Sequence, residues 1–486
     1  MSAELAGPAP RAGSRRRTLA LSIVVLLLAL AGGANAGRGD IRLWLLLGAF
    51  VAGAAVFANH RAAVFLILLS VFLFGWLSSV LGVLPRQATW LPELALIALS
   101  LRLMLEVPRK REVRILPADL ALACLLLIGL VSSLANLERA TVLAVGLRNY
   151  FKFVPLFYAI RWLDFDDDFL RRMLKALVAV ALVQVPVAAA QRALSFGLET
   201  GDIIGGTLGA NTSGTLTLFL LCIISLVAGA YLNGLIDTKR LLALMALLFV
   251  PMVINETKIT FILFPLLALF LFGKRAGFPD GMRRAAVPLA ASAVILLAGL
   301  VAYNTLYPGF FSSGEGLLGK EQLGYVTSER TKSGSLNRVA QLRFADRHIR
   351  KGASTAVFGV GPGNASDSFF GSGVGLYYRK YRLLEIDSLL GGRLLWEYGY
   401  LGSAIFVFLF VYFWLAASSL AARSPDPLRR SLAVGFQGIL IVAAVSAFYS
   451  GSILIPALGF VFWFAGGYVL RWQAEETNGR PDEEHL

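Results

Sequence analysis

Long apolar runs dominate the pattern along the chain, and short polar or basic connectors separate them. Many of the runs are about 17 to 23 residues long, and about 20 apolar residues in a helix cross a hydrocarbon core of roughly 30 Å. The pattern therefore predicts an all-α, polytopic membrane protein. About fourteen spans are expected, near residues 18–36, 41–58, 63–83, 90–106, 118–136, 141–162, 171–192, 213–233, 240–255, 258–273, 286–303, 399–421, 431–449 and 454–471.

The first apolar run has two interpretations. A basic stretch, Arg15 to Arg17, precedes it, and the small residues Ala34-Asn35-Ala36 follow it. These features are typical of a cleavable signal peptide. A first membrane span is favoured here because many spans follow, and cleavage would leave the rest of the topology unchanged.

The connectors indicate the orientation. Basic residues gather at 106–114, 273–284 and 422–430, and cytoplasmic connectors carry an excess of Lys and Arg. This puts both termini in the cytoplasm and a 95-residue, mostly helical loop on the outer side. The expected division is a bundle over 1–303, the loop over 304–398, further bundle over 399–471 and a cytoplasmic tail over 472–486.

Composition agrees with a membrane protein. The chain is 57% hydrophobic and 15% charged, with a mean hydropathy of +0.70, which is too apolar for a soluble protein. The net charge of +15 lies in connectors, which indicates contact with membrane lipids and no nucleic-acid partner. The two cysteines fall within apolar runs and the three histidines are scattered, so neither a metal site nor another cofactor is expected.

Two cations stand inside the sixth expected span. Arg148 and Lys152 lie one helical turn apart in "AVGLRNYFKFVPLFYAI". A cation at membrane depth is costly unless it faces a polar cavity or a partner. Snorkelling to the headgroups and pairing with Glu93 are the structural alternatives, and ligand binding is slightly favoured. Lys258 in "INETKITF" is expected at the same outer level, as a ligand or as an ordinary interfacial anchor.

The large loop adds more cations. "SLNRVAQLRFADRHIRK" (335–351) predicts an amphipathic helix with arginines on its polar sides. "FGVGPGN" (358–364) predicts a turn, or a backbone nest that could hold an anion. Cations at the outer leaflet beneath a basic loop suit an anionic lipid-linked substrate, with a diphosphate as the counter-charge.

The end of the loop carries the strongest local signal. "EIDSLLGGRLLWEYGYLG" (385–402) resembles the O-antigen ligase/polymerase superfamily, whose loop ends in His-Asn/Ser, nine residues and Gly-x-x-Gly. Gly399 and Gly402 match the glycines, whereas Ser388 stands where the ligase histidine would be. Asp387 is the nearest polar replacement. The resemblance covers roughly 140–410 and includes the Arg148 span and the Lys258 span start.

The resemblance implies a GT-C-like fold in a bacterial inner membrane, with the large loop periplasmic. It implies transfer of a glycan from an undecaprenyl diphosphate carrier to an acceptor hydroxyl. Because the ligase histidine is missing, a polymerase of lipid-linked repeat units is favoured, making exopolysaccharide, capsule or O-antigen, with a chain-length regulator or export machinery as a further partner. A ligase to lipid A core and a flippase for lipid-linked glycans are the alternatives.

The resemblance also assigns roles in an inverting, metal-independent transfer. The diphosphate would be held by Arg148, Lys152, Lys258 and Arg338. Asp387 or Glu385 would orient or deprotonate the acceptor hydroxyl, although Asp387 is equally well placed as a helix N-cap. Aromatic rings at Tyr377, Tyr378, Tyr381 and Trp396 would stack on sugars or anchor the interface.

Overall fold

The computed structural model of the protein describes residues 59–84, 86–109, 114–195, 203–273, 279–307, 328–331, 334–368 and 374–478. The first two expected spans, 18–36 and 41–58, lie outside these residues. The described chain is all-helical, and its one β-bridge joins Arg330 to Leu336. The α-helices are α3 (His60–Ser79), α4 (Leu91–Glu106), α5 (Pro117–Ala135), α6 (Ala140–Phe151), α7 (Val154–Trp162), α8 (Asp167–Leu194), α9 (Ser213–Leu232), α10 (Thr238–Ile254), α11 (Thr260–Ala268), α12 (Pro279–Leu306), α14 (Arg338–Ile349), α15 (Ala353–Phe358), α16 (Leu376–Tyr381), α17 (Leu390–Arg423), α18 (Pro427–Ser446) and α19 (Pro456–Asn478). The short helices are η1 (Arg86–Trp90), η2 (Val107–Arg109), η3 (Gly206–Leu208), η4 (Leu269–Gly273), η6 (Arg382–Leu384) and η7 (Ser452–Leu454).

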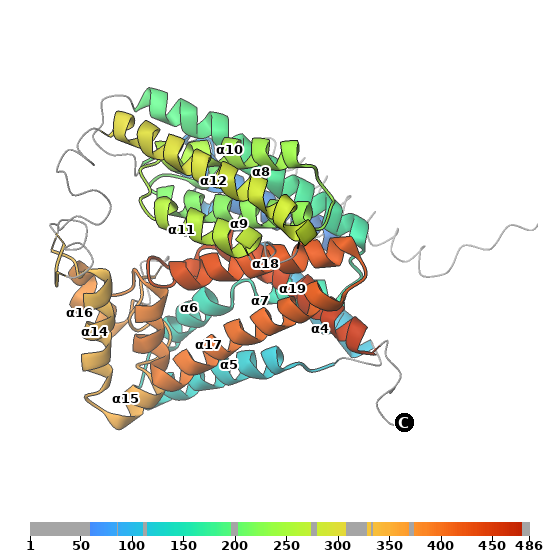
Figure 1. Ribbon diagram of the computed structural model, residues 1–486. Helices are drawn as coiled ribbons and strands as arrows, with labels where there is room; N and C mark the ends of the chain where they lie inside the picture. Colours follow the sequence, from blue (N-terminus) through green and yellow to red (C-terminus); the bar gives the residue numbers. More distant parts are fainter. Residues whose placement is uncertain are drawn as a thin grey trace, which may run out of the picture.

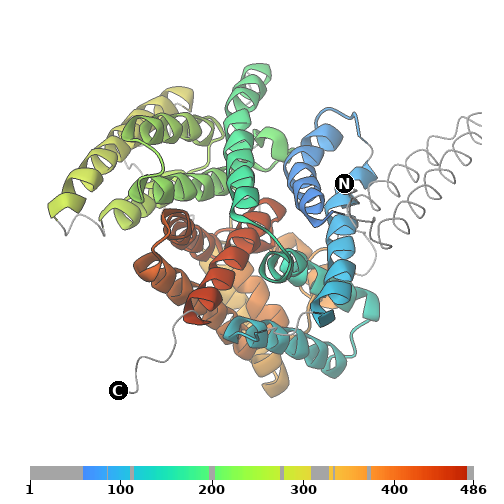
Figure 2. The ribbon, with the colours of Figure 1, turned by 90° about the vertical axis from the view of Figure 1, so that its right-hand side faces the viewer.

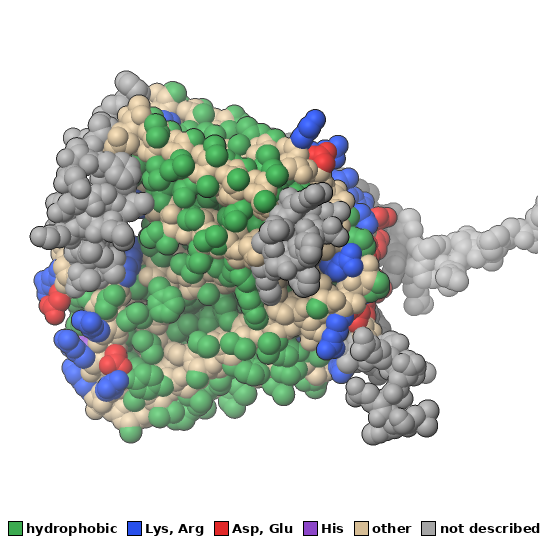
Figure 3. All heavy atoms as spheres, in the orientation of Figure 1, with side chains coloured by type: hydrophobic (Ala, Val, Ile, Leu, Met, Phe, Trp, Pro, Cys, Tyr) green, Lys and Arg blue, Asp and Glu red, His purple; other side chains and the backbone are tan. Residues whose placement is uncertain are grey.

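Eight helices in the described part are long and apolar enough to cross a membrane. This is consistent with a multi-pass membrane protein. Their bounds are His60–Ser79, Ala88–Glu106, Pro117–Ala135, Asp167–Leu194, Ser213–Leu232, Ala285–Leu306, Leu390–Arg423 and Pro427–Ser446. Figure 3 shows a band of hydrophobic side chains along these helices, with Lys and Arg side chains gathered at the two ends of the band. The expected total of fourteen spans stays a prediction.

The sixth expected span is not one helix. α6 ends at Phe151, and α7 begins at Val154 with a proline in its first turn. Pro155 has no N–H to donate and its ring opposes the carbonyl four residues earlier, so a helix cannot run through this point unchanged. The break falls at Lys152, which therefore lies at a helix end and not in the middle of a span.

The long helices run side by side, and α14, α15 and α16 gather at one end of them (Figure 1). α9 is the most enclosed candidate span, with 83% of its apolar window buried, and it packs against α18 and α10. Figure 2 shows α10 and α12 on one side of the molecule and α3 and α4 on the other, with α8 between them. The buried apolar residues of the long helices form one continuous core.

α17 contains a sharp bend at Gly399, where the backbone has φ +61° and ψ −161°. Its first part, residues 390–398, packs against α14 and α15, and the remainder runs along the bundle. A side chain at position 399 would be strained by this φ, and its Cβ would lie 2.6 Å from the Gly359 nitrogen. Gly399 thus lets the chain turn from the end layer into the bundle.

The end layer has a core of its own. We use this name for α14, α15, α16 and residues 390–398. Trp396 lies at the centre of this core and is 0% exposed, and Ala345 and Ile349 of α14 cover it. The amphipathic helix expected within 335–351 is present as α14.

Candidate functional site

A cavity of about 430 Å³ opens where the end layer meets the bundle. Its walls come from α3, the η1–α4 region, α6 with the break after it, η3, the loop that carries Asp367, the first part of α17, η7 and the start of α19. This volume lies within the range of roughly 300–1,000 Å³ that is usual for pockets that hold small molecules. The charged or polar lining residues include Thr89, Glu93, Arg148, Asn149, Lys152, Asp367 and Arg393.

Two of the predicted cations share one carboxylate. Glu93 of α4 accepts hydrogen bonds from the Arg148 guanidinium and from the Lys152 Nζ, the latter at 2.9 Å. The three side chains are 12–23% exposed. The pairing with Glu93 that the sequence offered as an alternative is therefore present. It does not remove the cations from the cavity, because all three residues line it.

Another part of the lining is Asp367, which lies on a short strap, residues 364–368, that two carboxylates hold by its backbone. Glu397 Oε1 accepts a hydrogen bond from the Ala365 N–H at 3.2 Å, and Asp387 Oδ2 accepts one from the Asp367 N–H at 3.1 Å. This arrangement leaves the Asp367 side chain as the carboxylate that lines the cavity on this side.

Asp387 is not the N-cap of α17. The N-cap is Leu389, and no side chain caps this helix end. Instead Arg393 donates to the Asp387 carbonyl at 2.9 Å, and its guanidinium lies 3.5 Å from Asp387 Oδ2. Asp387 thus orients both a cavity cation and the strap, which corrects the N-cap interpretation.

Tyr378 extends this polar cluster into the end layer. Burial and the neighbouring Asp387 and Asp367 carboxylates raise the pKa of its hydroxyl to about 12. The hydroxyl is therefore protonated at neutral pH and donates to Asp367. Of the four aromatic residues predicted to bind sugar, Tyr378 is the one with these carboxylate neighbours.

Three of the predicted aromatic residues belong to the core of the end layer. The Trp396 ring is fully buried, with the rings of Tyr377, Tyr381 and His348 at 5.2–6.2 Å. The prediction that Trp396 stacks on a sugar is wrong for this structure, because its faces are already covered. Burial also lowers the pKa of His348, so this side chain is a neutral member of the same cluster.

The other predicted residues lie outside the cavity wall. Arg338 reaches Ser388 Oγ at 3.4 Å and stacks over Tyr449 at 5.1 Å. Lys258 is exposed in the connector between α10 and α11. Glu385 is exposed in a left-handed turn after η6, with φ +53°. The structure does not bring these three to the Arg148 cluster.

The glycine turn at 358–364 is a packing element. The Gly359 N–H donates to Thr355 and the Gly361 N–H to Glu397 O, so neither points to an open anion site. A Cβ at Gly363 would lie 2.3 Å from the Val142 carbonyl oxygen, and one at Gly361 would lie 2.6 Å from the Glu138 carboxylate. These glycines let the turn approach the ends of α5 and α6 closely, and the anion nest is not formed there.

Sequence reasoning missed Asp367, Arg393 and Asn149. Asp367 stands in a Ser-rich stretch that carries no periodic signal, and Arg393 looks like an ordinary polar residue at a loop end. Only the folded backbone, through the strap and the bend at Gly399, shows that they reach the cavity. No protein-family model matches this chain, and no curated protein matches it.

Proposed function

We propose that the protein is a glycosyltransferase that polymerises undecaprenyl diphosphate-linked oligosaccharide repeat units at the periplasmic face of a bacterial inner membrane. One observation supports this most. A single cavity is lined both by Arg148 and Lys152, at the break within the sixth expected span, and by Asp367 from the large loop. Cations facing a carboxylate are what transfer from a diphosphate donor to a hydroxyl acceptor needs.

In this proposal the cations bind the donor diphosphate. Arg148 and Lys152 hold its oxygens, and Arg393 contacts them from the α17 side. When the bond between the anomeric carbon and the diphosphate breaks, negative charge develops on the leaving oxygen. Fixed cations in a partly enclosed site stabilise that charge more than water would.

Asp367 acts as the general base. The acceptor hydroxyl oxygen forms the new bond to the anomeric carbon, and its proton goes to the Asp367 carboxylate. The carrier diphosphate leaves with the electron pair of the broken bond. Asp387 holds Arg393 and the strap in place, so its role changes from the predicted base to a positioning residue.

The test is a reconstitution with purified protein, the host's lipid diphosphate-linked repeat unit and EDTA. A product ladder spaced by one repeat unit supports the polymerase. Transfer that appears only after lipid A core is added identifies a ligase instead. Movement of the lipid-linked glycan across vesicles without any transfer refutes the enzyme and indicates a flippase.

Two variants separate the assigned roles. Asp367→Asn should lower kcat by about 10²- to 10⁴-fold, the usual contribution of a general base. Asp387→Asn should lower kcat less, because the base itself is retained. Asp346→Asn, an acid of α14 that pairs with Arg350 at 3.0 Å, is the matched control and should keep turnover. Equal turnover in Asp367→Asn and the control would contradict the assignment.

A further inference from the structure

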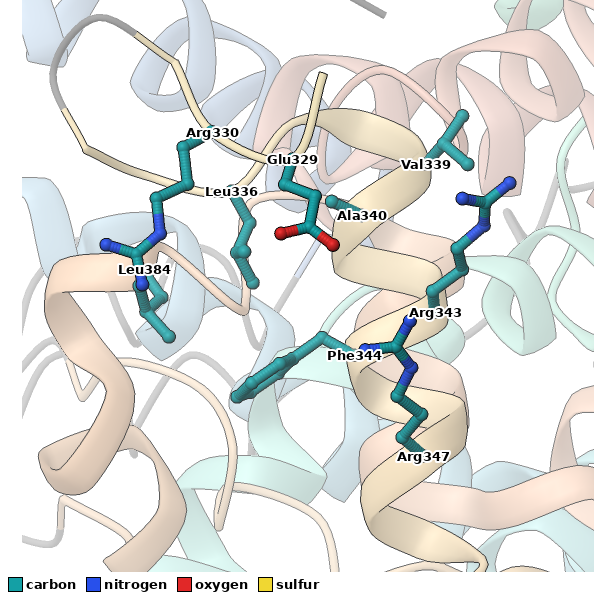
Figure 4. Close-up of a pocket in the computed structure, with 9 residues that line it drawn as sticks. All are labelled: Glu329, Arg330, Leu336, Val339, Ala340, Arg343, Phe344, Arg347 and Leu384. Atoms are coloured by element: carbon teal, nitrogen blue, oxygen red, sulfur yellow. The ribbon is translucent and has the colours of Figure 1, made fainter. Parts of the chain in front are cut away.

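A second hollow lies on the outward side of α14, away from the cavity. Its volume is about 230 Å³, and its polar lining consists of Glu329, Arg330, Arg343 and Arg347, with Phe344 among the apolar residues. Figure 4 shows Arg343 and Arg347 on α14, Glu329 and Arg330 on the facing segment, and the Phe344 ring between them. We call this hollow the arginine groove.

The arginines of the groove differ from the other arginines of α14. Arg338 contacts Ser388 and Tyr449, and Arg350 pairs with Asp346. Arg343 and Arg347 are exposed, and within the described chain neither has an ion-pair partner. Like charges four residues apart destabilise a helix by about 0.2–0.5 kcal/mol. The groove therefore holds a positive charge that the described protein does not neutralise.

The position of the groove favours a soluble anion over a membrane headgroup. α14 packs with its opposite side against residues 390–398, through Ala345, Ile349 and Trp396. Figure 1 shows α14 as the outer layer at the end of the long helices, and in Figure 3 Lys and Arg side chains gather at that end, outside the hydrophobic band. The arginine side of α14 thus faces away from the apolar band.

The size of the groove indicates part of a longer molecule. Its volume of about 230 Å³ is below the roughly 300–1,000 Å³ of pockets that enclose a whole small ligand. Guanidinium groups bind carboxylates with paired N–H donors. The Phe344 ring packs on His348 and Tyr381 but stays partly exposed, so it adds a small apolar surface beside the arginines. One acid, Glu329, leaves the groove with a net charge of +2.

We propose that the arginine groove binds a carboxylated glycan, with its acid groups on Arg343, Arg347 and Arg330 and its apolar CH groups against the exposed part of Phe344. It is a second glycan site outside the transfer cavity. The further statement that this glycan is part of the donor or of the product rests on the proposed function. The binding of an acidic polysaccharide to the groove does not depend on the proposed function.

The experiment measures binding to the full chain in nanodiscs of zwitterionic lipid. The probe is an oligogalacturonate, with an uncharged malto-oligosaccharide of the same length as the reference. The groove variant is Arg343→Gln/Arg347→Gln. The matched control is Arg379→Gln/Lys380→Gln, which removes the same charge from two exposed residues of α16 outside the groove.

The groove variant should bind oligogalacturonate at least about tenfold more weakly, because two charge-assisted contacts are lost. The control should bind as the wild type does, and added salt should weaken binding in both. Arg330→Gln, across the groove and off α14, should reproduce part of the loss if the double variant misfolds. Equal loss in groove and control variants would overturn the proposal, as would equal affinity for the uncharged sugar.

A lipid surface is tested in a separate arm. Vesicles containing phosphatidylglycerol are offered to the same variants, and a loss of vesicle binding with unchanged oligogalacturonate binding would also overturn the proposal. No donor lipid is present, so failure here leaves the transfer assay unaffected. Conversely, a chain that binds oligogalacturonate in the groove but makes no ladder would refute the proposed function alone.

Discussion

Glu93 gives a prediction with two opposite signs. It is the counter-charge of both Arg148 and Lys152, and it lies where a diphosphate would bind. Glu93→Gln keeps the size of the side chain and one acceptor but removes the charge. Without a ligand, the variant should be less stable than the wild type. A diphosphate should bind the variant more tightly, because the diphosphate no longer competes with the Glu93 carboxylate for the two cations.

The magnitude follows from burial. Removing one partner of a buried ion pair costs about 3–5 kcal/mol. Glu93 is 16% exposed, and glutamine can still accept a hydrogen bond, so we expect a loss of about 2–3 kcal/mol. Glu106→Gln is the control on the same helix. Its partner is Arg102 four residues away, the two side chains are 17% and 35% exposed, and such pairs contribute under about 1 kcal/mol.

The assay is thermal unfolding in detergent, with and without geranyl diphosphate as a soluble probe. Glu93→Gln should lower the unfolding midpoint more than Glu106→Gln does. It should also bind the probe about tenfold more tightly, which corresponds to one charge-assisted hydrogen bond released from competition. Weaker probe binding in Glu93→Gln than in wild type would refute the reasoning, since it would mean that the carboxylate organises the cations for the ligand.

Four further predictions concern other parts of the molecule. Gly399→Ala should destabilise the protein by at least about 1–3 kcal/mol in thermal unfolding, because this residue has a φ of +61°. Gly391→Ala on the same helix is the control. It should be neutral or slightly stabilising, because no atom lies within 3.4 Å of the added Cβ. Burial raises the pKa of Glu138 from 4.5 to about 8. The folded protein therefore holds a proton that the unfolded chain has released, stability should fall as pH rises through this window, and Glu138→Gln should flatten that fall in melts recorded at several pH values. Tyr378→Phe should lower turnover without changing the unfolding midpoint. Trp396→Ala should lower the midpoint by the equivalent of about 3–5 kcal/mol, the usual cost of removing a buried aromatic side chain. An unchanged midpoint in Trp396→Ala would contradict its place in the core.

The sequence predicted well those features that depend on local composition. Apolar runs indicated the helices because a span needs only length and hydrophobicity, and eight of them meet that standard in the described chain. The cost of a buried cation drew attention to Arg148 and Lys152, and both line the cavity.

Features that depend on long-range backbone contacts were not predictable from the sequence. The spacing from a glycine motif indicates Asp387, whereas the loop carboxylate that lines the cavity is Asp367 on the strap. The break after Phe151 does have a local signal, because Pro155 stands in the first turn of α7. The sequence offers Trp396 as a sugar-binding or interfacial residue, whereas the structure buries it, because nothing in the local pattern distinguishes a surface tryptophan from a core one.

The contact between Gly359 and Gly399 has a consequence for how such a chain can change over generations. A Cβ at Gly359 would lie 2.5 Å from the Tyr398 nitrogen, and a Cβ at Gly399 would lie 2.6 Å from the Gly359 nitrogen. Neither glycine can therefore be replaced unless the backbone around the other one moves. The same turn presses on Gly146 through Pro362 and Gly363. The end layer is therefore not an exchangeable module. A chimera that takes a foreign loop between residues 304 and 398 would keep the original α6 and Gly399, and the close contacts between them and the loop would be lost. A chimera that exchanges residues 129–146 and 358–402 together would keep both sides of these contacts.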